Sequence, residues 1–421
     1  MDPVADLCRF LDASPCAALA VDTLAADLRA AGFTEWPEDE AFPGTGHAKA
    51  FVRRGSALIA LIVRGPARRF HLVGAHTDSP HLMLKPRPAY HSEGCKCLGV
   101  EVYGGALWNS WLDRDLGLAG TVHASDGSAK AIRLHRPLAR VAQLAIHLDR
   151  RVNEEGLKLN AQNHLAPLWG LGGDAGAEFL ALLSEASGFA VTDIVGHQLS
   201  LYDLTPAARG GAGQDLIFSG RLDNLASCHA GLRALLASAD ADAEGTVSVL
   251  ACFDHEEVGS QSATGADGVF LDHVLERLTL AQGRGRADHL QALAASLLLS
   301  ADMAHAGHPN YGDRNEPRHK PRLGGGPVLK TNVNQRYATT GATAAQVHAY
   351  ARRAGCDLQD FVTRTDLGCG STIGPASAAN LGIAVADLGN PMLSMHSARE
   401  CAAAADHEPY IRLLAEHLSG R

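Results

Sequence analysis

The chain has no long basic run, and its charges are predominantly acidic. Its 421 residues carry 37 Lys and Arg against 46 Asp and Glu, a formal net charge of −9. A nucleic-acid partner is therefore not expected. No apolar run reaches the ~18 residues that a membrane-spanning helix needs. Residues 1–28 contain several acids and no basic segment ahead of an apolar stretch, so they do not resemble a secretory signal peptide, and we expect no membrane insertion.

The nine cysteines follow no repeated spacing. Cys95 and Cys97 form one close pair, and no second pair follows at the distance typical of a structural zinc site. An odd number of scattered cysteines is typical of reduced thiols. We therefore expect a cytoplasmic protein.

The chain does have an ordinary globular composition, 46% hydrophobic and 20% charged. Apolar spacing predicts helix over 1–35, followed by strands at 57–63 and 70–75. Short strand-like pieces and Gly-rich turns predict a β-rich insertion at 86–218, which separates two α/β parts, 1–85 and 219–421. Further strands are predicted at 98–103, 131–134, 216–218, 247–253, 293–299 and 383–388, and helices at 226–237 and 398–418.

Two adjacent acids, Glu256 and Glu257, follow the apolar run at 247–253. Burying two carboxylates at a strand end is costly without a positive partner, and a metal ion is the usual one. One glutamate can hold a metal while its neighbour acts on water. The two residues alone leave a solvated polar strand end equally open.

Other segments also place a histidine or an acid after an apolar run. His76 follows the strand at 70–75, and Asp78 lies at a spacing that suits an acid orienting a ligand, although a plain turn is the simpler alternative. Asp223 could equally be a helix N-cap. Ligands in an open α/β sheet lie beyond the carboxyl ends of its strands, so distant residues can meet there. The complete set is His76, Asp223, Glu256, Glu257, Asp302 and His396.

These nitrogen and oxygen donors suit two divalent ions, zinc foremost, with cobalt or manganese as alternatives. A spare glutamate would serve as general base, and the residues alone do not decide between Glu256 and Glu257. Metal pairs that activate water and clamp a carbonyl are used by aminopeptidases. The glycines around Ser371 do not form a Gly-x-Ser-x-Gly motif, and nothing marks Cys369 as an activated nucleophile.

Six motifs together resemble the aspartyl aminopeptidase family, dinuclear zinc metallo-aminopeptidases of the tetrahedral dodecamer type. The similarity covers nearly the whole chain and extends to Val100–Gly105 and Leu144–Leu148. The resemblance implies a mixed central sheet flanked by helices, with an inserted β-rich dimerisation domain. The motifs are Gly74–Pro80, Leu222–Asn224, Phe253–Ser260, Asp302–Ala306, Gln335–Thr339 and Met395–Ser397.

The resemblance also implies a role for each residue of the metal site. Asp223 would bridge two metals. Glu257 and His396 would complete one metal site, and His76 and Asp302 the other. Glu256 would be the general base, with Asp78 the acid beside His76.

Four further residues would surround the substrate in such a family member. Lys330 would be the counter-charge for an acidic side chain, with His305 and Tyr337 nearby. His147, which on the residues alone is a structural histidine, would reach a neighbouring subunit's active site. Dimers would build a dodecamer that hydrolyses N-terminal Asp or Glu from peptides. A neutral or broad N-terminal specificity is the alternative, and an inactive, metal-free assembly protein is a more remote one.

Overall fold

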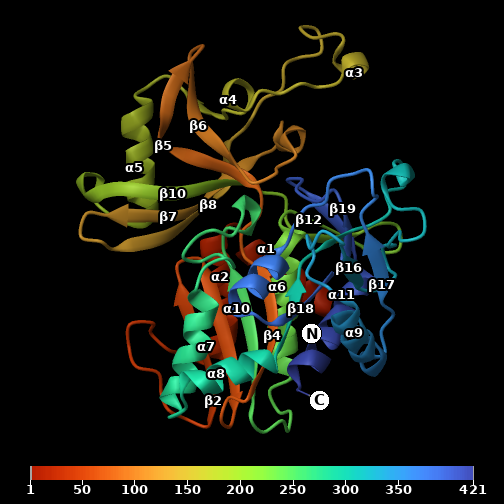
Figure 1. Cartoon of the computed structure of the whole chain (residues 1–421). Helices are drawn as coiled ribbons and strands as arrows, with labels where there is room; N and C mark the ends of the chain where they lie inside the picture. Colours follow the sequence, from red (N-terminus) through yellow and green to blue (C-terminus); the bar gives the residue numbers. More distant parts are fainter. Residues whose placement is uncertain (1, 421) are drawn as a thin grey trace. The chain divides into compact units, whose positions relative to one another are not determined.

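The computed structural model describes residues 2–420, which form two compact units (Figure 1). The first comprises Met1–Asp78, Ala207–Met395 and Glu400–Arg421. The second comprises Ser79–Pro206 together with the short segment His396–Arg399. The chain therefore enters the second unit twice, once through the long insertion and once near its end.

The first unit is built on a nine-stranded mixed sheet. In order across the sheet, its strands are β1 (Thr34–Glu35), β2 (His47–Arg54), β3 (Ala57–Arg64), β13 (Thr246–Phe253), β4 (Arg69–His76), β14 (Leu297–Ala301), β18 (Ala384–Gly389), β16 (Val328–Thr331) and β17 (Gln359–Val362). The central strands β13, β4, β14 and β18 run parallel, whereas β3 and β16 join them antiparallel. A parallel centre of this kind must be covered on both faces.

Helices supply that cover: α1 (Pro3–Ala13), α2 (Ala17–Ala30), α6 (Leu222–Ala237), α7 (Phe270–Ala281), α8 (Arg286–Ala294), α9 (Gly341–Ala354), α10 (Ile373–Leu381) and α11 (Ala404–Leu418). Helices α1, α2, α6, α9 and α11 share one apolar core, which includes Val73 and Leu250. Helices α7, α8 and α10 share the other, with Leu72 and Ala251. Successive strand residues point to opposite faces, so neighbours such as Leu72 and Val73 enter different cores.

A smaller five-stranded sheet completes the first unit. Its strands are β11 (Ala208–Gly210), β12 (Leu216–Ser219), β20 (Glu400–Ala403), β19 (Pro391–Leu393) and β15 (Ala304–His305). It connects the chain ahead of α6 with the chain that follows β14 and β18. The short turns η3 (Glu256–Val258) and η4 (Gly312–Arg314) belong to the same unit.

The second unit is a six-stranded antiparallel sheet packed against α5 (Ala175–Ser187). In order, its strands are β8 (Ala129–Ala139), β7 (Leu116–Ala124), β10 (Ile194–Asp203), β5 (His81–Ser92), β6 (Cys95–Tyr103) and β9 (Leu168–Leu171). Phe179 and Leu183 of α5 enter its apolar core. Its remaining short helices are α3 (Val152–Glu155), α4 (Ala161–His164), η1 (Trp108–Trp111) and η2 (Val191–Asp193).

The expected α/β fold, with a mixed central sheet flanked by helices and a β-rich insertion, is confirmed. Two predicted elements begin several residues later in the chain than expected. The closing helix was expected from 398, yet Glu400–Ala403 is a strand paired with β12. The strand expected from 293 begins at Leu297, because α8 extends to Ala294. Short apolar stretches do not distinguish helix from strand by their periodicity.

Candidate metal centre

Three parallel strands end side by side, and each carries chemically active side chains at its carboxyl end. His76 is the last residue of β4, in register with Phe253 of β13. Glu256 and Glu257 follow β13 in the η3 turn, and Asp302 directly follows β14. Because parallel strands end at the same sheet edge, the fold brings these residues together.

Asp223 joins this cluster from the first turn of α6. The N-cap position of that helix is Arg221, which makes no side-chain cap hydrogen bond, and the chain is kinked at Asp223 and Asn224. Asp223 itself has φ −82° and ψ 108°, outside the helical range. Its backbone N–H donates to Glu400 Oε2 at 3.2 Å.

The ligand-type atoms of five residues lie within coordination reach. His76 Nε2 is 3.5 Å from Asp223 Oδ1 and 3.9 Å from Glu256 Oε2. Two groups have their donor atoms within 4.8 Å of one another: His76, Asp223 and Glu257, and His76, Glu256 and Asp302. His76, Asp223 and Asp302 are buried. The cluster is therefore a dense, largely dry set of nitrogen and oxygen donors.

Asp78 holds two parts of this cluster in place. Its carboxylate Oδ1 lies 3.3 Å from His76 Nδ1, and its backbone carbonyl lies 3.0 Å from the same nitrogen. The two carboxylate oxygens also accept the backbone N–H groups of Glu256 and Glu257. A side chain that orients both a histidine ring and the two glutamates fits the supporting role expected of Asp78.

The cluster places several acids together largely out of contact with water, and this changes their pKa values. Burial raises the pKa of Glu256 to about 8; the His76 charge opposes this rise, and the charges of Asp302 and Asp223 add to it. Burial also raises the pKa of Asp302 to about 6 against the opposing charge of Lys330. Burial lowers the pKa of His76, but hydrogen bonds to Asp223 and Asp78 raise it well above its usual value. Protons taken up at these raised pKa values compensate the negative charge of the acids. A bound divalent cation would supply that positive charge instead, and the histidine and carboxylate donor set fits zinc.

Lys330 and Tyr337 lie beside the acids. Lys330 is buried on β16, and its ammonium is 3.8 Å from Asp302 Oδ1. It donates a hydrogen bond to the Met303 carbonyl at 3.1 Å and lies 5.1 Å from the centre of the Tyr337 ring. The structure therefore places these two expected substrate residues next to a candidate metal ligand.

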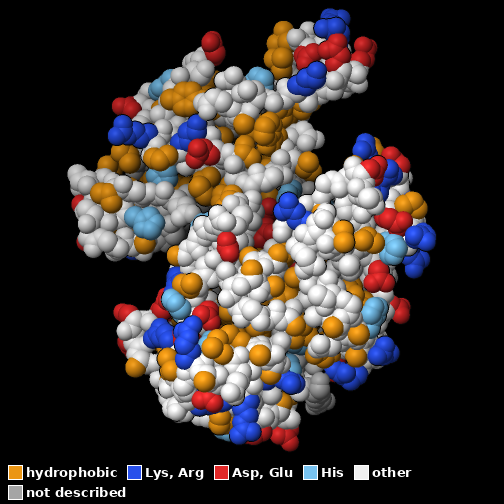
Figure 2. Space-filling view, in the orientation of Figure 1, with side chains coloured by type: hydrophobic (Ala, Val, Ile, Leu, Met, Phe, Trp, Pro, Cys, Tyr) orange, Lys and Arg blue, Asp and Glu red, His pale blue; other side chains and the backbone are white. Residues whose placement is uncertain are grey.

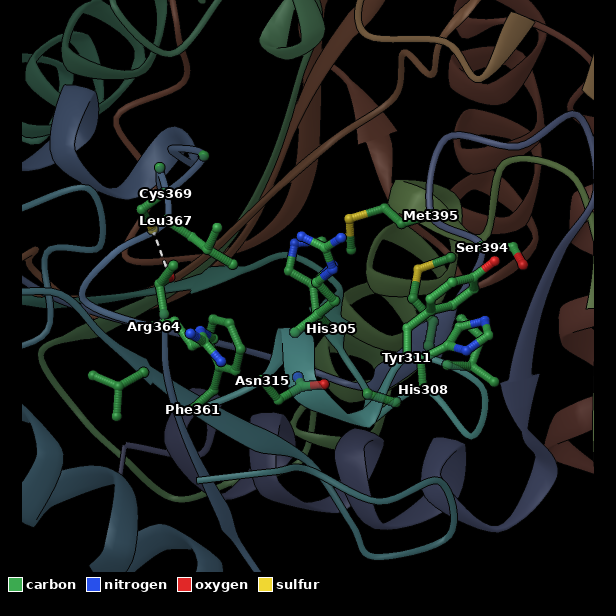
Figure 3. Close-up of a pocket in the computed structure, with 18 of the residues that line it drawn as sticks. His305, His308, Tyr311, Asn315, Phe361, Arg364, Leu367, Cys369, Ser394 and Met395 are labelled. Atoms are coloured by element: carbon green, nitrogen blue, oxygen red, sulfur yellow. Dashed lines mark hydrogen bonds between the residues drawn. The ribbon is translucent and has the colours of Figure 1, made fainter. Parts of the chain in front are cut away.

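A pocket of about 400 Å³ opens beside these residues, and His305 lies at the centre of the view in Figure 3. Tyr337 forms part of its wall. The Phe361 ring contacts both, with ring centres 5.9 Å from His305 and 6.3 Å from Tyr337. The pocket wall also includes Arg364, which forms an ion pair with Asp366 at 2.7 Å. His305 and Tyr337 thus share a cavity that is partly aromatic and partly cationic.

The two remaining expected site residues belong to the second unit. His396 Nδ1 is 3.1 Å from the Gly105 carbonyl, and the Leu107 N–H donates to the His396 carbonyl at 3.0 Å. His147 lies on an exposed loop that follows Val141. The structure describes both residues within that unit.

Two buried acids next to the site were missed in the sequence. Glu400 receives the Asp223 N–H, and Asp387 lies on β18 opposite Lys330. Asp387 stands in an otherwise apolar stretch, and an isolated acid in an apolar strand was the signal that could have identified it, whereas Glu400 follows Arg399 and carried no such signal.

None of the helices within residues 2–420 combines the length and the apolar character needed to cross a bilayer.

The similarity to known proteins extends over both units. Residues 10–417 match the family model described as aminopeptidase I zinc metalloprotease (M18). A probable M18 family aminopeptidase 2 of Streptomyces avermitilis is 48% identical over 406 residues, covering 95% of this chain and 94% of that protein.

Solved structures show the same fold. A chain in the Ape4 and Nbr1 complex superposes with a TM-score of 0.94 at 37% identity, over 99% of this chain and 85% of that one. The mApe1 dodecamer of S. cerevisiae gives a TM-score of 0.85 at 26% identity, over 100% and 96% of the two chains.

Proposed function

This chain belongs to the M18 family of aminopeptidase I zinc metalloproteases, and from that membership we propose that it removes N-terminal aspartate or glutamate from peptides. The observation that carries the acidic specificity is Lys330, a buried ammonium next to the acid cluster. A desolvated ammonium favours a carboxylate partner more strongly than an exposed one does. It is therefore suited to receive the side chain of an acidic first residue.

We propose that the cluster holds two zinc ions, for which cobalt or manganese are alternatives. Asp223 would be shared by both ions, Glu257 and His396 would complete one site, and His76 and Asp302 the other. When bound, the ions supply Lewis acidity, which polarises a carbonyl and acidifies water. The mixed histidine and carboxylate donors, and the excess of buried acid, support this assignment.

Glu256 is the general base of the proposed reaction. Its carboxylate takes a proton from the attacking water and then gives it to the nitrogen of the leaving amine. Asp78 fixes the backbone of Glu256 and of the neighbouring Glu257 through one hydrogen bond to each. Asp78 acts as a positioning residue in this scheme.

Recognition of the substrate falls to residues around the pocket. Lys330 pairs with the acidic side chain, while His305 and Tyr337 form the wall next to it. His147 would complete the site of a neighbouring copy, which would make activity depend on assembly. Its exposure on a loop supports that role.

We propose that copies of this chain form dimers that build a dodecamer, a proposal supported by its similarity to the mApe1 dodecamer. Apolar side chains around His147 are exposed: Leu144 at 65%, Ile146 at 47% and Leu148 at 74%. Figure 2 shows further hydrophobic side chains at the surface of the inserted unit. Exposed apolar groups clustered in one segment are typical of an interaction surface. We further propose that the enzyme acts in the cytoplasm, where its nine free cysteines would remain reduced.

A neutral N-terminal specificity is the second candidate. It is favoured by the apolar part of the pocket wall, which includes Phe361, Leu367 and Met392. A side chain such as leucine would bury apolar surface against this wall.

A panel of Asp-, Glu-, Leu- and Ala-anilides tests both candidates. We expect turnover of the Asp- and Glu-anilides to exceed that of the others, to disappear on treatment with a zinc chelator, and to return with added zinc. A preference for the Leu-anilide would reject the acidic specificity and the role of Lys330. Metal analysis before and after chelation measures the number of ions, and native mass spectrometry measures the assembly.

A further inference from the structure

Asp387 is a fully buried acid that the mechanism above does not use. It lies on β18 directly opposite Lys330 of the antiparallel strand β16. Residues opposite each other in an antiparallel pair share one face of the sheet. Burial raises the pKa of the Asp387 carboxyl, and the charge of Lys330 opposes that rise. Asp387 and Lys330 are therefore an electrostatic couple inside the protein.

Hydrogen bonds connect Asp387 to the segment that carries Tyr337. Its Oδ2 accepts the Ala338 N–H at 2.6 Å. Its own backbone N–H donates to Thr339 Oγ1 at 2.8 Å. The two residues that follow Tyr337 are thus both fixed to β18 by Asp387.

The same carboxylate also fixes the beginning of α10. Its Oδ1 accepts the hydroxyl of Thr372, the N-cap of that helix. The next turn approaches so closely that a Cβ on Gly374 would lie 2.5 Å from both carboxylate oxygens. Glycine is required there because no larger residue leaves room for the carboxylate. Residues just ahead of α10, Gly368 to Gly370, line the pocket, as does Tyr337. Asp387 is therefore hydrogen-bonded close to two segments of the pocket wall.

We propose that Asp387 is a positioning residue for acidic-substrate selectivity, holding Lys330 and Tyr337 where the side-chain carboxylate of the substrate binds. This inference rests on the proposed function. The Lys330 ammonium lies close to Asp302, the Met303 carbonyl and the Tyr337 ring, and Asp387 acts on it from the opposite position of the neighbouring strand. Without the Asp387 charge, Asp302 alone attracts the ammonium, which turns towards it and away from the substrate.

Asp387→Asn tests this role, because the amide oxygen can still accept the Ala338 N–H and the amide nitrogen can donate to the Thr372 hydroxyl. We expect KM for the Asp-anilide to rise ~10-fold, with kcat changed less than ~3-fold. We expect kcat/KM for the Ala-anilide and the zinc content to stay as in wild-type. A residue with only a structural role would lower turnover of both substrates together.

Asp406→Asn is the matched control. Asp406 is also a buried acid, and it accepts two backbone N–H groups, from Gly324 and Gly326, in place of any contact with Lys330. It is expected to change stability but not the ratio of Asp-anilide to Ala-anilide turnover. The comparison separates loss of a buried carboxylate from loss of this particular one.

A double-mutant cycle with Lys330→Met tests whether Asp387 acts through Lys330. Asp387→Asn should have no further effect on KM for the Asp-anilide once Lys330 is replaced. If Asp387→Asn does not fold, Thr339→Val loosens the same segment and is expected to raise that KM ~3-fold while leaving the Ala-anilide unaffected.

The possible failures are distinguishable. A wild-type enzyme without acidic preference overturns the proposed function and this inference with it. A wild-type enzyme that prefers acidic substrates, combined with an unchanged Asp to Ala ratio in Asp387→Asn and in Thr339→Val, overturns the inference alone. Additive effects in the cycle would overturn the link to Lys330.

Discussion

The carboxylate of Asp78 accepts the backbone N–H of Glu257 at 3.1 Å, and its second oxygen accepts that of Glu256 at 3.2 Å. Asp78 therefore holds the proposed base and the proposed metal ligand through their backbone. One carboxylate thus positions both adjacent glutamates of the turn. It also makes the turn dependent on a residue that comes from another strand end.

Asp78→Ala should lower kcat/KM by ~10- to 100-fold, since His76 and the backbone N–H groups of both glutamates lose the acid that orients them. Asp78→Asn keeps one acceptor oxygen and should retain more activity. Steady-state kinetics with the Asp-anilide measure both. Equal loss in the two variants would show that the charge of Asp78, and not its hydrogen bonds, is what matters.

Replacing the two glutamates one at a time should separate their roles. Glu256→Gln is expected to lower kcat by ~10²–10⁴-fold while zinc remains bound, because only proton transfer is lost. Glu257→Gln should instead reduce the zinc content, because a ligand is lost. Metal analysis by mass spectrometry, combined with anilide turnover, measures both effects. Full turnover by Glu256→Gln would rule out that residue as the base.

Much of the site could be predicted from the sequence, because β4, β13 and β14 are apolar runs that each end in a histidine or an acid. That local pattern is enough to place His76, Glu256, Glu257 and Asp302 at one sheet edge. The two glutamates could not be told apart, because only the folded site places Glu257 with Asp223 and Glu256 with Asp302, residues far away in the chain.

Other features depend on pairings that no local pattern encodes. The opposition of Lys330 and Asp387 follows from the register of β16 with β18. The strand at Glu400–Ala403 exists because β12 pairs with it, although its alanine-rich sequence also suits a helix. His396–Arg399 lies with the inserted unit although it is close to the end of the chain. Such tertiary context overrides local preference.

Removing zinc should lower the thermal stability of the enzyme. The buried acids of the cluster repel one another without a cation, and a ligand present at ~100–1,000 times its Kd stabilises by ~3–4 kcal/mol. Differential scanning fluorimetry with and without a chelator measures the shift in Tm. In the metal-free form, Glu257→Gln should melt above wild-type because it relieves repulsion, and it should respond less to added zinc. An unchanged Tm after complete zinc removal would contradict this account of the cluster.

The buried pair His71 and His417 should make the protein less stable in acid. Their rings pack edge to face with centres 5.3 Å apart. Burial lowers the pKa of His71 to about 4, with help from nearby arginines, and burial together with His71 lowers that of His417 to about 3. Both folded-state pKa values lie below the unfolded value of about 6.5, so the unfolded chain binds more protons between pH 3 and 6.5. Stability is therefore present above that window and is lost as the pH falls through it.

When the pH falls from 7 to 5, each of these two histidines should lower the free energy of unfolding by about 2 kcal/mol. His71→Leu removes two buried ring nitrogens that lack hydrogen-bond partners, and it should make the pH dependence shallower by about one proton. The midpoint of urea unfolding, measured at half-unit steps of pH on the zinc-loaded enzyme, tests this. His273→Gln, at an exposed histidine, serves as the control and should keep the wild-type slope. A His71→Leu variant with the wild-type slope would mean that protonation elsewhere governs acid unfolding.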